Sequence, residues 1–384
     1  MKKSRLDNNK RASANPSSLN KQSAASYFCI MEIGICTFAD VGTHPITKEV
    51  IDPHKRLLNL IEEIELADQS GLDVFAVGEH HRPDYAVSTP VTVMAAAAVK
   101  TKQIRLSSGV TVLSSDDPVR VFQQFATVDL LSSGRAEIMA GRGSFIESFP
   151  LFGYNLNDYD ELFSEKLEML IKLNESEKVS WKGKHTQTID DLGIYPRPYQ
   201  TKLPIWIAVG GTPESVVRAA QYGLPTMLAI IGGMPARFAP FVKLYRDVYA
   251  KTNHPNDQLQ IGINSHTYIA ETSQQARDEF YPPYSEVMTR IGRERGWSGM
   301  SRADFDAATG PHAHLLVGSP QQVIDKILYQ HSLFGHTRFL AQMSIGAMPH
   351  QQVMKAIELL GNVVAPAVRK YTNQSSAEIT TTGI

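Results

Sequence analysis

The 384-residue sequence contains only two cysteines, no long apolar run and no excess of either charge. Cys29 and Cys36 cannot build a disulfide framework, and their spacing does not match a CxxC metal site. A net charge of -1 argues against nucleic-acid and membrane-surface binding, because both need a basic patch. A spanning helix would need roughly 18 consecutive apolar residues, and no stretch approaches this. We therefore expect a soluble, cytoplasmic protein.

Both ends of the chain have the composition of disordered segments. Residues 1–30 are rich in Asn, Ser and Lys and lack the apolar stretch of a secretory signal. Met31 directly precedes the first strand-like run, so it is a candidate natural start. Residues 372–384 are similarly polar. The sequence predicts one folded domain over residues 31–371, between an N-terminal extension and a C-terminal tail.

Short apolar runs alternate with amphipathic helical patterns in this domain. Asp52-Pro53 and Asp117-Pro118 are typical helix starts, in which a capping side chain precedes a proline. Eight runs have the length and composition of buried strands, namely residues 32–38, 73–77, 104–113, 135–141, 203–209, 225–230, 259–270 and 336–343. This alternation predicts an α/β fold, a single (β/α)8 TIM barrel, with an open doubly wound sheet as the alternative.

The chain exceeds the ~250 residues typical of a TIM barrel, so it must contain insertions. One is expected after strand 4, at residues 179–200, as a hairpin. The other follows strand 7, at about residues 271–314, where the regular alternation is interrupted. Long loops at an active face are usually functional. We therefore predict that the second insertion is a lid.

The fifth predicted strand runs into a candidate anion site. It is followed by Gly210 and Gly211, and Thr212 then stands at the first turn of a helix. Free N–H groups at a helix start bind anions, and glycines let the backbone approach them closely. Thr212 and Ser215 lie three residues apart, so both hydroxyls can face one ligand. An ordinary capped helix is the alternative.

Arg142 stands between two glycines at the end of the fourth strand. A planar guanidinium in this position can bind a phosphate, and a surface salt bridge is the alternative. Strands four and five are consecutive and therefore expected to be neighbours, which would place Arg142 beside the Thr212 helix. The two features together predict a site for a phosphorylated cofactor.

The second strand ends in the sequence Gly-Glu-His-His, residues 78–81. If the strand continues, His80 and His81 point to opposite sides and only one faces the barrel axis. A neutral imidazole there can act as a general base or hydrogen-bond partner, whereas a purely structural histidine is the alternative. Adjacent histidines cannot chelate from one strand face and no HExxH motif occurs, so we expect no metal site. Three further residues at strand ends form a candidate substrate pocket: Phe38, Glu79 and Gln342.

Together these motifs resemble the bacterial luciferase-like family of flavin-dependent monooxygenases over about residues 31–370. The most specific parts are GEHH (78–81), the run from 107 to 144, YPRPYQTKLPIWIAVGGTPES (195–215), AAQYGLP (219–225) and VGSPQQVIDKI (317–327). The resemblance implies a TIM barrel that binds FMN. It also implies reaction of reduced FMN with O2, the reduced FMN coming from a separate flavin reductase, and oxygenation of a small organic substrate such as an alkanal. A homodimer is expected, since dimers are common in this family.

The same resemblance implies roles for individual residues. His80 would be the catalytic-site acid or base. A non-prolyl cis peptide would lie at Gly109-Val110, beneath the flavin ring. The cofactor-binding residues would be Gly109, Val110, Arg142, Gly210, Gly211, Thr212 and Ser215. Of these, Arg142, Gly211, Thr212 and Ser215 would contact the phosphate.

Two departures from luciferase itself limit the analogy. Gly141 stands where luciferase has a reactive cysteine, and the segment after strand seven has its own sequence. Light emission and a long-chain aldehyde substrate are therefore not expected. An oxidoreductase that uses a deazaflavin, known in the same barrel family, is one alternative function. A non-catalytic flavin-binding protein is another, and a metal-dependent hydrolase is the least favoured.

Overall fold

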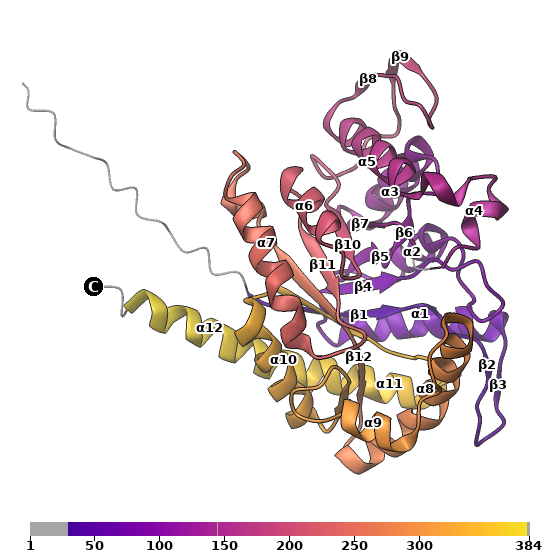
Figure 1. Ribbon diagram of the computed structural model, residues 1–384, viewed down its shortest axis with the longest axis vertical. Coiled ribbons are helices and arrows are strands. Elements are labelled where there is room, and N and C mark those ends of the chain that lie inside the picture. Colours follow the sequence, from indigo (N-terminus) through magenta and orange to yellow (C-terminus); the bar gives the residue numbers. More distant parts are fainter. Residues whose placement is uncertain (1–29, 144, 382–384) are drawn as a thin grey trace, which may run out of the picture.

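The computed structural model describes residues 30–143 and 145–381, so the predicted N-terminal extension lies almost wholly outside the described residues. Parallel strands pair in the order β1, β4, β5, β7, β10, β11, β12, β14, and β14 pairs again with β1 (Figure 1). Because β7 pairs with β10, the sheet closes on itself. The predicted TIM barrel is confirmed, and the open-sheet alternative is wrong.

The eight barrel strands lie within the predicted runs: β1 (Glu32–Thr37), β4 (Val74–Val77), β5 (Arg105–Ser108), β7 (Ala136–Gly141), β10 (Ile205–Val209), β11 (Thr226–Ala229), β12 (Ile261–Ile269) and β14 (Arg338–Gln342). Two short strands extend the sheet, β6 (Thr111–Val112) beside β7 and β13 (Leu316–Gly318) beside β12. A small hairpin of β2 (Gly42–Thr43) and β3 (Val50–Ile51) follows β1.

Helices follow the strands and cover the barrel: α1 (Pro53–Gln69), α2 (Pro90–Ala98), α3 (Pro118–Ser132), α5 (Tyr159–Glu175), α6 (Pro213–Gln221), α7 (Ala239–Tyr249), α10 (Pro320–Phe334) and α11 (His350–Leu359). Both predicted helix starts are confirmed. Asp52 accepts a hydrogen bond from the backbone N–H of Lys55 at 3.0 Å, and Asp117 accepts one from Arg120 at 2.9 Å. These caps satisfy donors that the first helical turn leaves unpaired.

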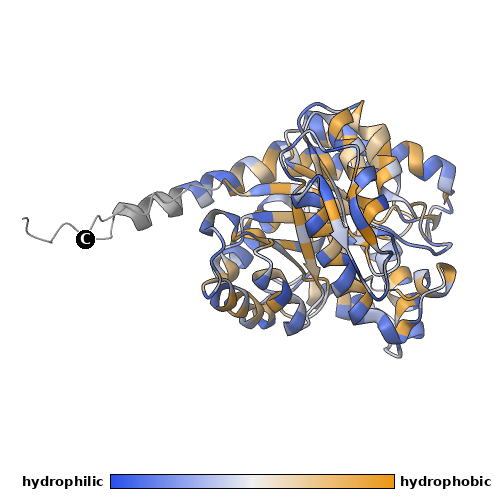
Figure 2. Cartoon of the chain, turned by 90° about the horizontal axis from the view of Figure 1, so that it is seen from above, coloured by the Kyte–Doolittle hydropathy of each residue, from blue (hydrophilic) through white to orange (hydrophobic). Residues whose placement is uncertain are grey.

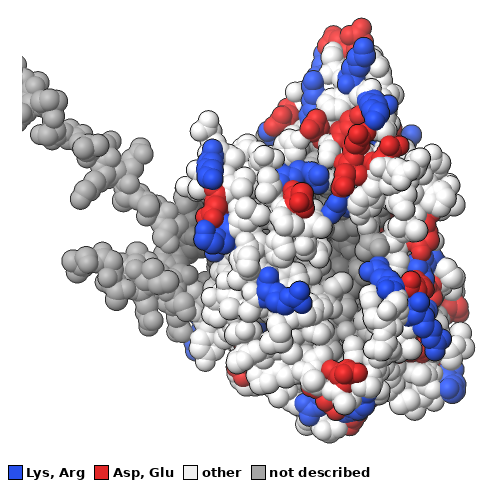
Figure 3. Space-filling model, viewed as in Figure 1, with Lys and Arg blue, Asp and Glu red and all other residues white. Residues whose placement is uncertain are grey.

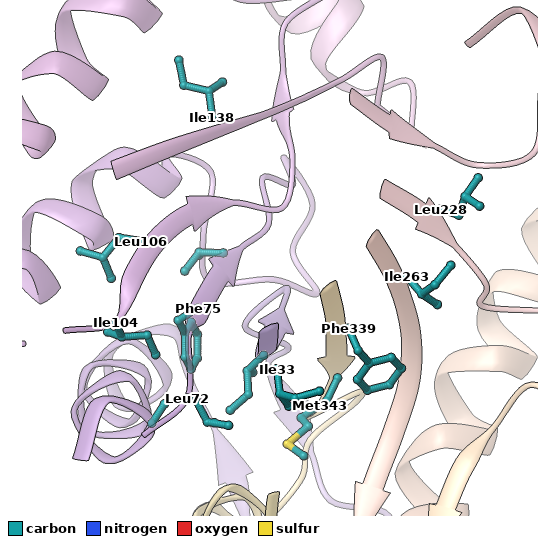
Figure 4. Close-up of a cluster of buried hydrophobic side chains, with 14 of the residues drawn as sticks. Ile33, Leu72, Phe75, Ile104, Leu106, Ile138, Leu228, Ile263, Phe339 and Met343 are labelled. Carbon is teal, nitrogen blue, oxygen red and sulfur yellow. The ribbon is translucent and has the colours of Figure 1, made fainter. Parts of the chain in front are cut away.

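Apolar side chains form one layer outside the barrel and another inside it. The outer layer lies between strands and helices and includes Ile33, Phe75, Leu106 and Phe339 (Figure 4). The hydropathy of the residues follows the same arrangement (Figure 2). The strands are mostly apolar, and the helices carry polar residues on their outer sides. Six residues of the inner layer are Cys36, Ala76, Met139, Trp206, Met227 and Leu340. The alternation of side chains along each strand thus supplies both layers.

Buried charges occupy the barrel interior at the amino ends of the strands. Arg338, 2% exposed, donates to Glu137 at 2.7 and 3.1 Å and to Glu32 at 2.6 Å. Arg105 also pairs with Glu137, at 2.9 Å, and with Glu32. Burial alone would raise the pKa of Glu137, but Arg338 and Arg105 outweigh it and the pKa is lowered. These ion pairs fill the barrel interior at the amino ends of the strands.

The first insertion is the predicted hairpin, with β8 (Lys178–Trp181) antiparallel to β9 (Ile189–Gly193). The second insertion, for which we predicted a lid, is mainly helical. It forms the helices α8 (Ser273–Arg295) and α9 (Arg302–Ala308). Although α8 contains two prolines, Phe280 stacks on Tyr268 at 5.4 Å and on Tyr284 at 5.1 Å. This packing outweighs the weak helical propensity of the sequence.

The chain ends in α12 (Ala365–Thr381), which follows a π-helical turn (Leu360–Val364). The segment from residue 372 is thus helical as far as Thr381, where the composition indicated a tail. Acidic and basic side chains are interspersed on the face shown in Figure 3, in keeping with the near-zero net charge. Within the described ranges, no helix combines the length and apolar character needed to cross a membrane.

Candidate active site

The carboxyl ends of the barrel strands surround a cavity of about 340 Å³. Its wall contains nine of the predicted site residues: Phe38, Glu79, His80, Gly109, Val110, Arg142, Gly210, Thr212 and Gln342. The remaining two, Gly211 and Ser215, are not part of the wall. Gly211 directly precedes Thr212, and Ser215 lies in the first turn of α6. The structure therefore brings the predicted residues together at one place.

Arg142 lies beside the start of α6, as predicted from the strand order. It donates from Nη2 to Thr212 Oγ1 at 2.9 Å and to Ser215 Oγ at 3.2 Å. The two hydroxyl oxygens are 2.8 Å apart. Thr212 stands at the helix-cap position, yet its side chain makes no capping hydrogen bond. Its hydroxyl instead faces Arg142, which the ordinary capped-helix alternative does not explain.

The backbone beside Arg142 is open on the cavity side. A Cβ atom added to Gly210 or Gly211 would meet no atom within 4 Å, and Gly211 has a φ of +119°. A group with several acceptor oxygens can therefore approach the backbone, the guanidinium and the two hydroxyls together. Arg142 also pairs, from Nη1, with Asp160 at 2.6 Å, an exposed carboxylate at the start of α5. These residues fit a phosphate.

His80 lies in the loop after β4, because the strand ends at Val77. Its ring packs against three aromatic rings, with centroid distances of 4.4 Å to Phe38, 4.4 Å to Tyr85 and 5.3 Å to Phe145. Its Nε2 atom is buried and has no hydrogen-bond partner. Burial lowers the pKa of His80 to about 3, with smaller contributions from His81 and Arg82. The imidazole is therefore neutral near pH 7.

His81 faces away from this cavity. Its Nε2 lies 2.9 Å from Glu79 Oε1, and its ring packs on Phe152 at 5.1 Å. The predicted separation of the two histidines is confirmed, but the assumed strand geometry is wrong, because the loop and not the strand separates them. Glu79 also accepts a hydrogen bond from the backbone N–H of Val112 at 2.9 Å. Its carboxylate therefore holds the loop in place.

The Gly109-Val110 peptide bond is cis, as the family resemblance implies. Gly141 contacts it closely, since a Cβ atom at this position would lie 2.7 Å from Val110 Cγ2. Any larger residue at 141, including cysteine, would require Val110 to shift. Cys36, which we had not placed in the site, lines the same cavity. Burial raises the pKa of its thiol to about 12, so it stays protonated and is a poor nucleophile.

Asn264 is a cavity residue that sequence reasoning missed. It lies within β12 and donates from Nδ2 to Gln342 Oε1 at 2.8 Å. The available signal was the run of four polar residues, 264–267, inside a buried strand, because such groups need buried partners. His266 also lies inside β12, which continues to Ile269, and its Nδ1 is 3.3 Å from the hydroxyl oxygen of Tyr284.

Ion pairs connect three segments of the chain near His80. We call the five residues that form them the Arg82 cluster: Arg82, Asp84, Glu147, Arg290 and Glu294. Arg82 donates to Glu147 at 2.7 Å and to Glu294 at 2.6 and 2.9 Å. Arg290 pairs with Asp84 at 3.0 Å. The cluster thus connects the loop after β4 with α8 and with the residues before α4 (Ser148–Leu151). The guanidinium carbon of Arg82 also lies 4.6 Å from the centroid of the Phe145 ring.

In the described part of the chain, one group of side chains is close enough to share a metal ion, namely Asp158, Glu161 and His185. None of these residues lines the cavity. Glu161 is fully exposed and already pairs with Lys184 at 2.6 Å. The group therefore has no connection with the candidate active site.

Comparison with known proteins places this geometry in context. The model of the family described as luciferase-like monooxygenase matches residues 31–337. Limonene 1,2-monooxygenase of Rhodococcus erythropolis is 29% identical over 340 residues, which cover 83% of this chain and 87% of that protein. F420-dependent glucose-6-phosphate dehydrogenase of Amycolatopsis mediterranei is 30% identical over 162 residues, 40% of this chain and 48% of that protein.

The fold is also found among solved structures. The oxygenating constituent of 3,6-diketocamphane monooxygenase from Pseudomonas putida, a type II Baeyer-Villiger monooxygenase in complex with FMN, superimposes with a TM-score of 0.70. It is 18% identical, and the match covers 88% of this chain and 98% of that one. At this identity the likeness supports the barrel fold alone.

Proposed function

This chain belongs to the luciferase-like monooxygenase family, and we propose that it is the oxygenating component of a two-component, FMN-dependent monooxygenase. In this proposal a separate flavin reductase supplies reduced FMN, and the protein acts as a homodimer. One oxygen atom of O2 enters a small organic substrate, and the other leaves as water. His80 is the acid or base, or the hydrogen-bond partner, at the reacting atoms.

The observation that carries this proposal is the arrangement of Arg142, Thr212 and Ser215 at one end of an apolar cavity that contains His80. Phosphate oxygens would replace Asp160 as partners of the guanidinium. When bound, reduced flavin supplies the reducing equivalents for O2 activation. Met139, Met227 and Leu340 line the cavity and would keep bulk water from the reacting atoms.

A deazaflavin is the competing cofactor, because a relative that uses F420 is 30% identical over 162 residues. Oxygen dependence separates the two functions. The protein is mixed with NADH, a flavin reductase, FMN and a panel of small cyclic terpenes and ketones, and substrate-dependent O2 uptake and product formation are measured. Turnover that continues without O2, with reduced F420 as donor, would contradict the monooxygenase function. A bound flavin that supports neither reaction would indicate a binding protein.

The phosphate assignment makes a first prediction. Replacing Arg142 with alanine removes a charge-assisted contact, and we expect FMN affinity to fall by about 10–100-fold. Riboflavin affinity should change little, because riboflavin has no phosphate. Dissociation constants for both ligands are measured by fluorescence titration of wild type and variant.

Asp160→Ala is the matched control, since it removes the other partner of Arg142 and leaves the guanidinium in place. We expect this variant to bind FMN at least as tightly as wild type. Equal weakening of FMN and riboflavin binding by Arg142→Ala would show that Arg142 supports the fold of the cavity and does not bind phosphate.

A further inference from the structure

Asn264 and Gln342 form a buried amide pair in the cavity wall, away from the phosphate pocket. They lie on the neighbouring strands β12 and β14, whereas Arg142 and Thr212 follow β7 and β10. Around the barrel, β11 lies between β10 and β12, and three strands, β1, β4 and β5, lie between β14 and β7. Asn264 is 8% exposed and Gln342 3% exposed, and both line the cavity. The amide pair and the phosphate pocket therefore face each other across the barrel mouth.

The carbonyl oxygen of Asn264 is an acceptor without a partner. Its amide nitrogen is held by Gln342 at 2.8 Å, while Oδ1 is buried and makes no hydrogen bond. Among the described side chains that line the cavity, only Asn264 Oδ1 and His80 Nε2 are both buried and unpaired. The nearby wall is apolar and includes Cys36, Met227 and Leu340. A buried acceptor in such a place is unfavourable unless a ligand supplies the donor.

We propose that Asn264 accepts a hydrogen bond from the ring N–H of the flavin's dione edge, with Gln342 as its positioning residue. This inference rests on the proposed function and specifies how the cofactor is oriented. The dione edge carries one N–H between two carbonyl groups, and burying it without partners would be unfavourable. With the phosphate at Arg142 and the dione edge at Asn264, the cofactor spans the barrel mouth. His80, on the β4 side, is then left to face the substrate.

The test removes the donor and the acceptor separately. The donor is removed with 3-methyl-FMN, in which a methyl group replaces the ring N–H, and the acceptor with Asn264→Leu, which keeps the side-chain volume. We expect each change alone to weaken binding by about 10–100-fold, and both together to weaken it no further. Affinities are measured by fluorescence titration without turnover. Met227→Leu, in the same cavity, is the control and should leave the ratio of the two affinities unchanged.

Other outcomes would overturn the assignment. Equal wild-type affinity for FMN and 3-methyl-FMN would mean that the ring N–H is not bound. Unchanged FMN affinity in Asn264→Leu, with a raised KM for an oxygenated substrate, would assign the amide to a donor on the substrate. If the wild-type protein bound neither FMN nor 5-deaza-FMN, the proposed function would fail and this inference with it. If either flavin binds and methylation has no effect, the orientation alone is wrong.

Discussion

Replacing His80 with alanine is expected to slow product formation by about 10²–10⁴-fold, the usual contribution of a positioned acid, base or hydrogen-bond partner. The unpaired Nε2 of His80 lies in the cavity wall, and the variant would remove it. Flavin affinity should be retained, because the proposed flavin contacts follow β5, β7 and β10 or lie on α6 and β12. O2 consumption should continue while product falls, so hydrogen peroxide release should rise. Product, O2 uptake and peroxide are measured together.

His81→Ala is the control for this experiment, because His81 does not line the cavity and contacts only Glu79 of the residues that do. We expect a modest loss of stability and a much smaller loss of product. Since burial lowers the pKa of His80 to about 3, the imidazole is neutral near and above pH 5. The rate of product formation should therefore show no ionisation of His80 between about pH 5 and 8. Near-normal turnover of His80→Ala would remove this residue from the mechanism.

Replacing Arg338 with methionine is expected to lower the free energy of unfolding by about 3–5 kcal/mol. The variant leaves the carboxylate of Glu137 buried with only one of its two cationic partners, Arg105. It also removes the guanidinium that lies 4.1 Å above the ring of Trp206. Urea unfolding curves of wild type and variant would measure the difference.

The effect of Arg338→Met should depend on pH. The pKa of Glu137 in the folded protein is lowered from 4.5, so its ion pairs stabilise the wild type above about pH 4.5. That contribution is lost as the pH falls below this value, and the difference between the two proteins should shrink. Lys202→Met, which breaks the exposed pair with Glu175, is the control and should change stability little. A similar loss in both variants would show that the buried network has no special role.

The barrel could be predicted from the sequence because most strands are short apolar runs and several helices begin with a capping residue and a proline. The phosphate pocket could also be predicted, since Arg142 and Thr212 follow strands that are consecutive in the chain. Contacts between segments that are far apart in the sequence could not be predicted. Asn264 and Gln342 are 78 residues apart, and Arg82 and Glu294 are 212 apart. In each case nothing near one residue indicates its partner.

Helix α8 could not be predicted for a different reason. The sequence shows only that the strand–helix alternation is interrupted there, and the aromatic stacking of Phe280 on Tyr268 and Tyr284 that stabilises the helix arises only once the chain has folded. The position of His80 shows a related limit. Its orientation follows from the loop after β4 and from the rings of Phe38, Tyr85 and Phe145, not from strand alternation.

The Arg82 cluster has an evolutionary consequence. The anion pocket is built from residues at the carboxyl ends of β7 and β10 and at the start of α6, whereas the Arg82 cluster includes Glu147, before α4, and two residues of α8, which lie outside the repeating strand–helix plan. The two parts can therefore diverge at different rates. If α8 acts as the lid that we predict, exchange of this segment would alter what enters the cavity, provided that a carboxylate still pairs with Arg82. A lineage with this architecture can acquire new substrates by changing its insertions while it inherits an unaltered cofactor site.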